Sequence, residues 1–431
     1  MVLAPTSDAL SFLDGLQPSR MVFDLHGFEA LLAAIGDPQL AFPAIHVAGT
    51  NGKGSVCAIA EAVLRASGLH TGRYTSPHLD HPGERITLDG AALETAAFAS
   101  AVRALRDLIA RRAPSTPYTY FDFLTALAFQ QFAARAVDVA VVETGLGGRL
   151  DSTRPCRPRV TCITPISRDH TEILGEDLTV IASEKAGILR PGVPCIIGPQ
   201  PAAVTQMLSA RADEIGSPMV VFGRDFSAEA IAPGETDRRI VYHPLRGAPM
   251  ELTVPLAGAH QVANAACALG SVELFVGAPL DPMTVTLGLA GVSWPGRCEW
   301  LGDNRFLLDG AHNVASARAL GRYLADCGRS VHLVWGMLRG KDPEGFLSAL
   351  RVPLAGATLP RLADPRAIPP DELVAYVQET PIDAVGESVT SLVPRLRRCL
   401  PATTVVCVTG SLTLVGEARR VLAAATQFPV V

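Results

Sequence analysis

Apolar residues along this chain occur in two alternating patterns, short continuous runs and longer amphipathic stretches. Runs such as Ile45–Ala48, Val137–Glu143 and Val160–Ile166 predict buried strands, because a strand covered on both faces needs no polar alternation. Stretches with apolar residues three and four positions apart, as in Val56–Ser67 and Phe121–Ala136, predict helices. Strands that alternate with helices are typical of an α/β fold with a parallel sheet.

The same patterns divide the chain into two halves. Further strands and helices are predicted at Leu69–Thr75, Leu93–Ala113, Asp177–Gly187, Pro194–Ile197 and His260–Val276. Between them, Arg239–Tyr242 and Met250–Val254 alternate strictly and predict a small antiparallel addition. A stretch with Pro295 and Gly296 then interrupts the pattern, which favours two domains, 1–294 and 295–431. In the second domain the elements are expected at Arg305–Asp309, Ala315–Cys327, Ser330–Trp335, Pro343–Leu350, Gly356–Leu359, Thr404–Thr409 and Thr413–Ala425.

Composition narrows the classes of partner. The chain has 431 residues, of which 48% are hydrophobic and 18% charged, as in ordinary globular proteins. A net charge of −5 and a pI near 6.1 argue against nucleic acid or an anionic membrane as partner. Nine scattered cysteines without a C-x-x-C pair suit reduced thiols, and no signal peptide or membrane-length apolar run is present. We therefore expect a cytoplasmic protein, active as a monomer.

A glycine-rich turn, Gly49-Thr50-Asn51-Gly52-Lys53-Gly54-Ser55, joins the first predicted strand to the helix that follows it. Backbone N–H groups in such a turn, together with the helix N-terminus, favour a polyphosphate. Lys53 would reach the terminal phosphates and the Ser55 hydroxyl would bind Mg²⁺. In the generic phosphate loop the lysine directly precedes the hydroxyl residue, whereas here Gly54 separates them. A turn without a ligand is the alternative, and the register of strand, lysine, serine and helix counts against it.

Polar residues follow two other strands of the first domain. Glu143 ends an apolar strand, which is the usual position of a Mg²⁺ or water ligand beside a phosphate loop. A capping role is the alternative, and the glycines after Glu143 disfavour it. His170 follows the strand Val160–Ile166 at the same sheet edge, so a metal-ligand role and a structural role remain equally open. Lys185 closes a helix, where the simplest interpretation is a solvated cation.

The second domain repeats this arrangement. Asp309 and His312 follow a strand and precede a helix, and Arg297 lies in the linker between the domains. These three side chains could complete a site that faces the phosphate loop. The residues alone therefore indicate an ATP- and Mg-dependent transferase or ligase that acts in a cleft between domains.

Short motifs occur in a fixed order between about residue 20 and residue 420. They are His46–Ser55, Thr75–Leu79 with Glu84–Ile86, Thr119–Thr125, Glu143–Asp151, Asp169–Thr171 with Leu174–Gly175, Glu184–Ile188, His260–Gln261 with Asn264–Ala265, Pro295–Arg297, Asp309–Asn313, Gly336–Met337 with Lys341–Asp342, and Thr409–Leu412. In this order they resemble the folylpolyglutamate synthase/dihydrofolate synthase family, within the Mur-type ATP-dependent amide ligases. The resemblance implies a P-loop-type parallel-sheet ATPase domain with a small antiparallel addition, followed by a smaller Rossmann-like α/β domain.

The resemblance also implies a reaction and its residues. The γ-phosphate of ATP would activate a carboxylate as an acyl phosphate, which the amine of L-glutamate attacks to give an amide, ADP and phosphate. The implied ATP-binding residues are Asn51, Gly52, Lys53, Gly54, Ser55, Asn264, Arg297 and Asp309. The implied Mg²⁺ ligands are Ser76, Glu143 and His170, with a second metal at Lys185, which the resemblance implies is carbamylated. The implied pterin-side residues are Thr119, Tyr120, Phe121, Asp122, Leu150, Asp151 and Ser152. Catalysis is implied for Lys53, Lys185 and His312, the last near the reacting phosphate or the incoming glutamate.

Three functions follow from these observations. The first is a ligase that adds L-glutamate to dihydropteroate, to reduced folates, or to both. The second is a Mur-type cell-wall ligase acting on a UDP-muramoyl substrate, but the phosphate loop begins by residue 49, which leaves no room for an extra N-terminal UDP-binding domain. The third is a nucleotide-binding switch protein, for which Glu143, His170, Lys185 and Asp309 would be hard to explain.

Overall fold

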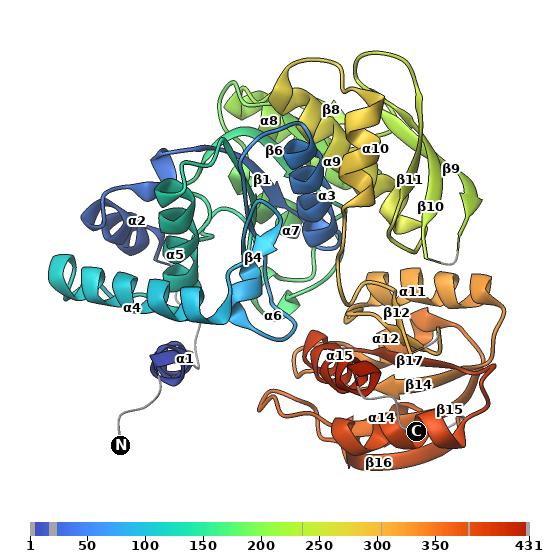
Figure 1. The fold of residues 1–431 in the computed structure, drawn as a ribbon. Coiled ribbons are helices and arrows are strands. Elements are labelled where there is room, and N and C mark those ends of the chain that lie inside the picture. Colours follow the sequence, from blue (N-terminus) through green and yellow to red (C-terminus); the bar gives the residue numbers. More distant parts are fainter. Residues whose placement is uncertain (1–4, 17–23, 235, 303, 378–379, 428–431) are drawn as a thin grey trace.

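The computed structural model describes residues 5–16, 24–234, 236–302, 304–377 and 380–427. Its strands form a large mostly parallel sheet, a small antiparallel sheet and a second, mostly parallel sheet near the carboxyl end. Figure 1 shows the chain after β11 and α10 passing into a separate group of helices and strands, coloured orange to red. The expected α/β class, with an antiparallel addition and a second α/β unit, is confirmed.

The large sheet has β1 near its centre. Its strands are β1 (Pro43–Ala48), β2 (Thr71–Tyr74), β3 (Ile86–Leu88), β4 (Ala91–Ala92), β5 (Val139–Glu143), β6 (Arg157–Ile163), β7 (Cys195–Ile197) and β8 (Met219–Val221), in the spatial order β4-β3-β2-β5-β1-β6-β7-β8. β1 runs parallel to β5 and β6, and Val47 lies opposite both Glu143 and Cys162. The carboxyl ends of these three strands therefore meet at one sheet edge, as the sequence predicted.

Helices cover both faces of this sheet. They are α1 (Pro5–Gly15), α2 (Leu25–Ala34), α3 (Lys53–Ala66), α4 (Thr95–Arg112), α5 (Tyr120–Ala134), α6 (Thr171–Leu174), α7 (Leu178–Lys185), α8 (Ala202–Ile215), α9 (His260–Val276) and α10 (Pro282–Ala290), with short 3₁₀ turns η1 (Pro38–Leu40), η2 (Pro82–Arg85) and η3 (Ala186–Ile188). Side chains of β5 alternate between the two cores: Val139 and Val141 pack with α3 and α9, and Ala140 and Val142 pack with α4 and α5. This alternation is the period of two expected of a strand.

Two local features fix where the helices around the cavity begin. α3 starts at Lys53, three residues earlier than the apolar pattern indicated, because Gly52 adopts a left-handed conformation (φ 90°) that only glycine takes without strain. α5 starts after Thr119, whose side chain accepts from Asp122 N while the Asp122 carboxylate accepts from Thr119 N. This reciprocal cap satisfies two backbone donors that a helix N-terminus leaves open.

The antiparallel sheet lies against α9 and α10. It consists of β9 (Ser227–Pro233), β10 (Arg238–His243) and β11 (Met250–Val254), in the order β11-β10-β9. Ile240, Tyr242 and Leu252 point into the core that contains α3, α9 and α10. The sheet therefore extends the cover of the helix that follows the phosphate loop.

The last part of the chain has its own sheet, with strands β12 (Glu299–Leu301), β13 (Phe306–Leu308), β14 (Val331–Trp335), β15 (Leu354–Arg361), β16 (Ile382–Ser388) and β17 (Val405–Thr409), in the order β12-β13-β17-β14-β15-β16. Its helices are α11 (Val314–Cys327), α12 (Pro343–Leu350), α13 (Pro370–Leu373), α14 (Val389–Cys399), α15 (Leu412–Gln427) and the turn η4 (Val374–Tyr376). One face packs on α11 and α12, and the other on α14 and α15. No helix within the described ranges combines the length and apolarity that a bilayer crossing needs.

Candidate functional site

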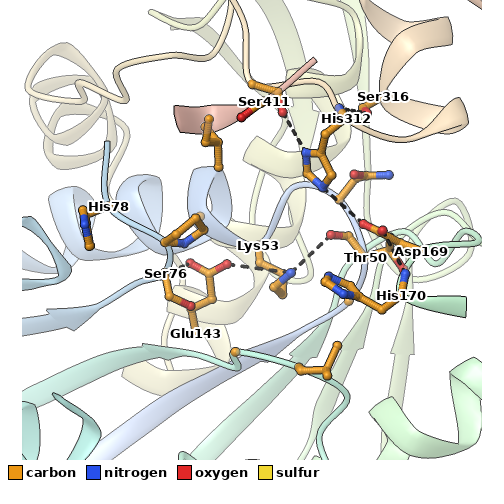
Figure 2. Close-up of a pocket in the computed structure, with 18 of the residues that line it drawn as sticks. Thr50, Lys53, Ser76, His78, Glu143, Asp169, His170, His312, Ser316 and Ser411 are labelled. Atoms are coloured by element: carbon orange, nitrogen blue, oxygen red, sulfur yellow. Dashed lines mark hydrogen bonds and ion pairs between the residues drawn. The ribbon is translucent and has the colours of Figure 1, made fainter. Parts of the chain in front are cut away.

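A cavity of about 1590 Å³ opens between the two α/β parts. Each residue to which the sequence assigned an ATP, metal, substrate or catalytic role lines it. Figure 2 shows the centre of this cavity, with Lys53 between Glu143 on one side and Asp169 and His170 on the other. The fold therefore brings together side chains that the sequence separates by more than 250 residues.

The phosphate loop is fixed by bonds to the segment after β6. Thr50 N donates to Pro165 O (3.1 Å), and the Thr50 hydroxyl donates to Ser167 O (3.1 Å). Lys53 Nζ donates to Thr50 O (3.2 Å) and lies 3.8 Å from Glu143 Oε1. The ammonium group is thus held over the loop while it still faces the cavity.

Asn264 lies against the turn of the loop. A Cβ at Gly52 would come within 3.0 Å of Asn264 Cγ, so the turn and the amide are in close contact. The Asn264 side chain is buried, and its Nδ2 donates to Gln261 Oε1 (2.9 Å). Glycine is required at position 52 both for this approach and for its left-handed φ.

Glu143 is a buried carboxylate at the end of β5. Burial raises its pKa, while the charge of Lys53 and the hydrogen bond from Ser76 N (3.2 Å) oppose this rise. Ser76 and Glu143, two of the metal ligands that the resemblance implies, therefore lie next to each other (Figure 2). A cation would offset the cost of ionising a buried carboxylate.

His170 and Asp169 occupy the turn after β6. Desolvation lowers the pKa of His170 to about 4, against the opposing charge of Asp169. A neutral imidazole is the form that can bind a metal. Burial alone would raise the pKa of Asp169, but hydrogen bonding and the charges of His312 and Lys341 hold it well below its usual range. Asp169 is therefore a buried anion that His312 and Lys341 face.

Lys185 is not the solvated cation that its place at a helix end suggested. The side chain is only 5% exposed, and Nζ donates to Gly49 O (2.8 Å) at the start of the phosphate loop. Desolvation and the nearby charge of Lys53 lower its pKa to about 7. A fraction of the amine is therefore neutral near neutral pH, which makes it nucleophilic.

The opposite wall comes from the second sheet. Asp309 Oδ2 accepts from Cys298 N (2.9 Å) and Oδ1 accepts from Ala311 N (2.9 Å), which fixes the carboxylate. Arg297 lies beside it, with Nη1 donating to Gly296 O (3.0 Å). His312 bonds Gly310 O through Nδ1 (2.8 Å) and Asp169 Oδ2 through Nε2 (3.2 Å). Both ring nitrogens are thus engaged, so the imidazole is held in one orientation across the cavity.

Helix α5 and the loop after β5 form the end of the cavity assigned to the pterin. The Ser152 hydroxyl bonds Asp122 Oδ1, which links this loop to the cap of α5. Asp151 Oδ2 accepts from Leu146 N (2.8 Å), and Oδ1 accepts from Thr153 N (2.9 Å). Asp151 therefore shapes the loop, since its carboxylate oxygens accept hydrogen bonds from backbone N–H groups of the same loop.

Some cavity residues had no assigned role. Arg85 Nε donates to His78 Nδ1 (2.9 Å), and the Arg85 guanidinium carbon lies 5.4 Å from the centre of the Tyr120 ring. Desolvation and Arg85 lower the pKa of His78 to about 3, so its ring is neutral. The two residues lie in the motifs Thr75–Leu79 and Glu84–Ile86. The sequence therefore indicated that they matter, but not where their side chains lie.

Asn313 and Lys341 also lie in quoted motifs and had no assigned role. The Asn313 amide donates to Asn51 Oδ1 (3.1 Å) and to Asp169 Oδ2 (3.0 Å), and Lys341 Nζ bonds Asp169 Oδ1. These contacts join the two parts of the chain. No local pattern could have predicted them, because each pair is separated by more than 140 residues.

Comparisons with known proteins identify relatives over most of the chain. Residues 47–272 match the Mur ligase middle domain, and residues 296–412 match the Mur ligase glutamate ligase domain. The dihydrofolate synthase/folylpolyglutamate synthase of Mycobacterium tuberculosis is 36% identical over 411 residues, covering 88% of this chain and 84% of that protein. The folylpolyglutamate synthase of Lacticaseibacillus casei is 35% identical over 348 residues, covering 79% and 81%.

Solved structures of similar proteins also match this chain over almost its whole length. The M. tuberculosis folylpolyglutamate synthase complexed with ADP superposes with a TM-score of 0.90 at 34% identity, over 97% of this chain and 98% of that one. E. coli FolC in complex with DHPP and ADP gives a TM-score of 0.87 at 29% identity, over 98% and 99%.

Proposed function

The chain belongs to the folylpolyglutamate synthase/dihydrofolate synthase branch of the Mur ligase family, and from this premise we propose its reaction. It is an ATP-dependent amide ligase that joins L-glutamate to a folate-type carboxylate. Dihydropteroate, reduced folates, or both serve as acceptors. The cell-wall ligase and the switch protein are not favoured, because the similar proteins carry names of folate-ligating enzymes.

One observation carries this proposal. A single cavity has the phosphate loop and Glu143 on one wall and Asp309 with His312 on the other. A ligase of this kind must hold a triphosphate and a carboxylate together, although both are anions. The cations at the cavity wall, Lys53 and Arg297 among them, would screen this repulsion. Closure between the two walls would exclude water from an acyl phosphate, which hydrolyses readily.

We propose that Mg²⁺ binds at Ser76, Glu143 and His170. This set contains one carboxylate, which suits Mg²⁺, because that ion usually binds one or two carboxylates and substrate phosphates and keeps several waters. The buried Glu143, with its raised pKa, fits such a partner. When bound, the ion would neutralise charge on the phosphates.

We propose that Lys185 is carbamylated and contributes to a second metal site. The lowered pKa supplies a neutral amine, which can add CO₂ and release a proton. The carbamate nitrogen keeps one N–H, so the bond to Gly49 O would survive the modification. The negative carbamate would lie near Lys53, whose charge now opposes protonation of Lys185.

His312 would act on the phosphate or on the incoming glutamate. Its ring is oriented by Gly310 O and Asp169 across the cavity. When protonated, a ring held there would stabilise negative charge that develops on the transferred phosphate. Asn264, Arg297 and Asp309 would hold the rest of the nucleotide.

We also propose that the chain has two domains and acts as a monomer in the cytoplasm. The domains would be residues 1–294 and 295–431, which separates the strands of the large and antiparallel sheets from those of the carboxyl-terminal sheet. Both cavity walls come from one chain, so a monomer suffices. The cysteines, most of which are buried, suit the reducing cytoplasm.

The reaction is tested with purified protein, ATP, Mg²⁺ and L-glutamate. Adding dihydropteroate or tetrahydrofolate should release phosphate and yield a glutamylated product by mass spectrometry. Comparing the two acceptors shows which activity is present. Phosphate release with a UDP-muramoyl acceptor, but with neither pterin, would overturn the proposal.

The metal residues are tested separately. Glu143→Ala and His170→Ala should abolish turnover while circular dichroism and the thermal midpoint show a folded protein. Glu214→Gln changes an exposed carboxylate on α8 and should leave turnover unchanged. Full activity of Glu143→Ala would refute its role.

A further inference from the structure

Trp294 lies directly before the Pro295-Gly296-Arg297 linker and packs against the phosphate loop. A Cβ added at Gly54 would meet its indole, with Cε2 at 2.9 Å and Nε1 at 3.1 Å, and Cζ2 closer still. Gly54 has helical backbone geometry, so conformation alone does not require glycine there. The ring instead excludes any side chain, which explains the glycine that separates Lys53 from Ser55.

The indole is held in place from β2. The Arg73 guanidinium carbon lies 5.1 Å from the centre of the Trp294 ring, within cation–π range. Arg73 Nη1 is 3.7 Å from Glu61 Oε2, and Glu61 Oε1 accepts from the Thr71 hydroxyl (2.7 Å). Glu61 and Thr71 are buried, and the Arg73 side chain is nearly so. The ring therefore packs on a buried ion-paired side chain, which holds the indole in one position.

The chain enters the opposite cavity wall immediately after Trp294. Gly296 N donates to Glu299 Oε2 (2.9 Å), and a Cβ at Gly296 would touch Leu79 and Val415. Arg297, three residues after Trp294, lines the cavity. Trp294 thus touches the loop that would hold the phosphates and begins the segment that carries a phosphate-screening cation.

We propose that Trp294 is a positioning residue that fixes the first turn of α3 and ties it to the linker. It does not line the cavity itself, so it acts through Gly54 and through the path to Arg297. The kinetic consequence rests on the proposed function, whereas the effect on nucleotide binding does not.

The test measures ADP affinity by calorimetry and steady-state kinetics. Trp294→Ala should weaken ADP binding about tenfold, the equivalent of one lost cation–π and packing contact. It should also raise the KM for ATP and lower kcat, since Arg297 loses its anchor. Trp294→Phe keeps a flat ring over Gly54 and should recover most of both. Leu280→Ala removes a partly buried side chain from the same core but is not at the cavity, so it should lower stability without changing ADP affinity.

Two results would overturn the inference about Trp294, and a third would overturn only the proposed reaction. ADP affinity in Trp294→Ala equal to wild type, or an equal loss in Leu280→Ala, overturns the inference. If the wild type binds ADP and Trp294→Ala binds it weakly, but no folate acceptor supports turnover, the inference stands and the proposed reaction fails.

A double-mutant cycle tests the contact without any ligand. Gly54→Ala alone should lower the thermal midpoint, because the new methyl group overlaps the indole. In the Trp294→Ala background the same change should cost little, since the obstructing ring is gone. Additive effects of the two substitutions would show that Gly54 and Trp294 do not interact, and would overturn the inference.

Discussion

The burial of Lys185 predicts a specific dependence of stability on pH. Its pKa falls from 10.5 in the unfolded chain to about 7 in the folded protein, which corresponds to about 5 kcal/mol. The folded state thus holds fewer protons than the unfolded state between pH 7 and pH 10.5. The free energy of unfolding must therefore rise with pH across this window, by about 1.4 kcal/mol per pH unit from this group.

Replacing the lysine tests this magnitude. Lys185→Met removes the buried charge but leaves Gly49 O without its donor, which costs about 1–3 kcal/mol. At pH 6 the Met variant should therefore be more stable than wild type by about 3 kcal/mol in CO₂-free buffer. The advantage should vanish above pH 10. Lys185→Gln restores a donor without the charge and separates the two effects.

The assay is urea unfolding at fixed pH values from 6 to 10.5, with and without added bicarbonate. If Lys185 forms a carbamate, bicarbonate should stabilise wild type and leave both variants unchanged. Nuclear magnetic resonance with ¹³C-bicarbonate should show a carbamate carbon only in wild type. Parallel pH profiles for wild type and Lys185→Met between pH 7 and pH 10 would refute the lowered pKa.

Three further substitutions test other parts of the structure. Asp169→Asn keeps the shape but removes the charge that faces His312 and Lys341 across the cavity, weakening closure by about 3 kcal/mol; small-angle scattering should show a larger radius of gyration, and an unchanged radius would contradict this. Asp122→Ala breaks the cap of α5 and the bond to Ser152, lowering stability by about 1 kcal/mol; it should raise the KM for the pterin substrate while ADP affinity stays constant, and equal losses of both would count against a pterin-side role. Gly321→Ala places a methyl group against Leu350 O between α11 and α12, so it should cost about 1–3 kcal/mol in thermal unfolding, and a stable variant would show that these helices can separate freely.

The apolar runs predicted most strands near the cavity, because continuous burial leaves a clear pattern. β11, α9 and α12 lie within the expected residues, whereas α3 begins earlier than the pattern indicated. That difference arose because its first turn contains Lys53, Gly54 and Ser55, which carry little apolar signal but follow a glycine with positive φ. The strands β3, β4, β8, β9, β12 and β16 were not predicted, because edge strands and short strands bury too little to stand out.

The sequence by itself determined the fold class and indicated candidate residues for the chemistry, because a phosphate loop and an acid at a strand end follow from local geometry. Only the tertiary structure decided which of those residues are buried and which side chains they pair with. From its sequence position Lys185 resembles a solvated cation, but packing buries it against Gly49. Asp169 gains its partners His312 and Lys341 only when the two parts of the chain meet. In the sequence, Gly54 makes the phosphate loop look irregular. The structure gives the reason, because the indole of Trp294, 240 positions later, lies over Gly54. Burial and charge pairing depend on residues distant in sequence, so no local pattern could contain them.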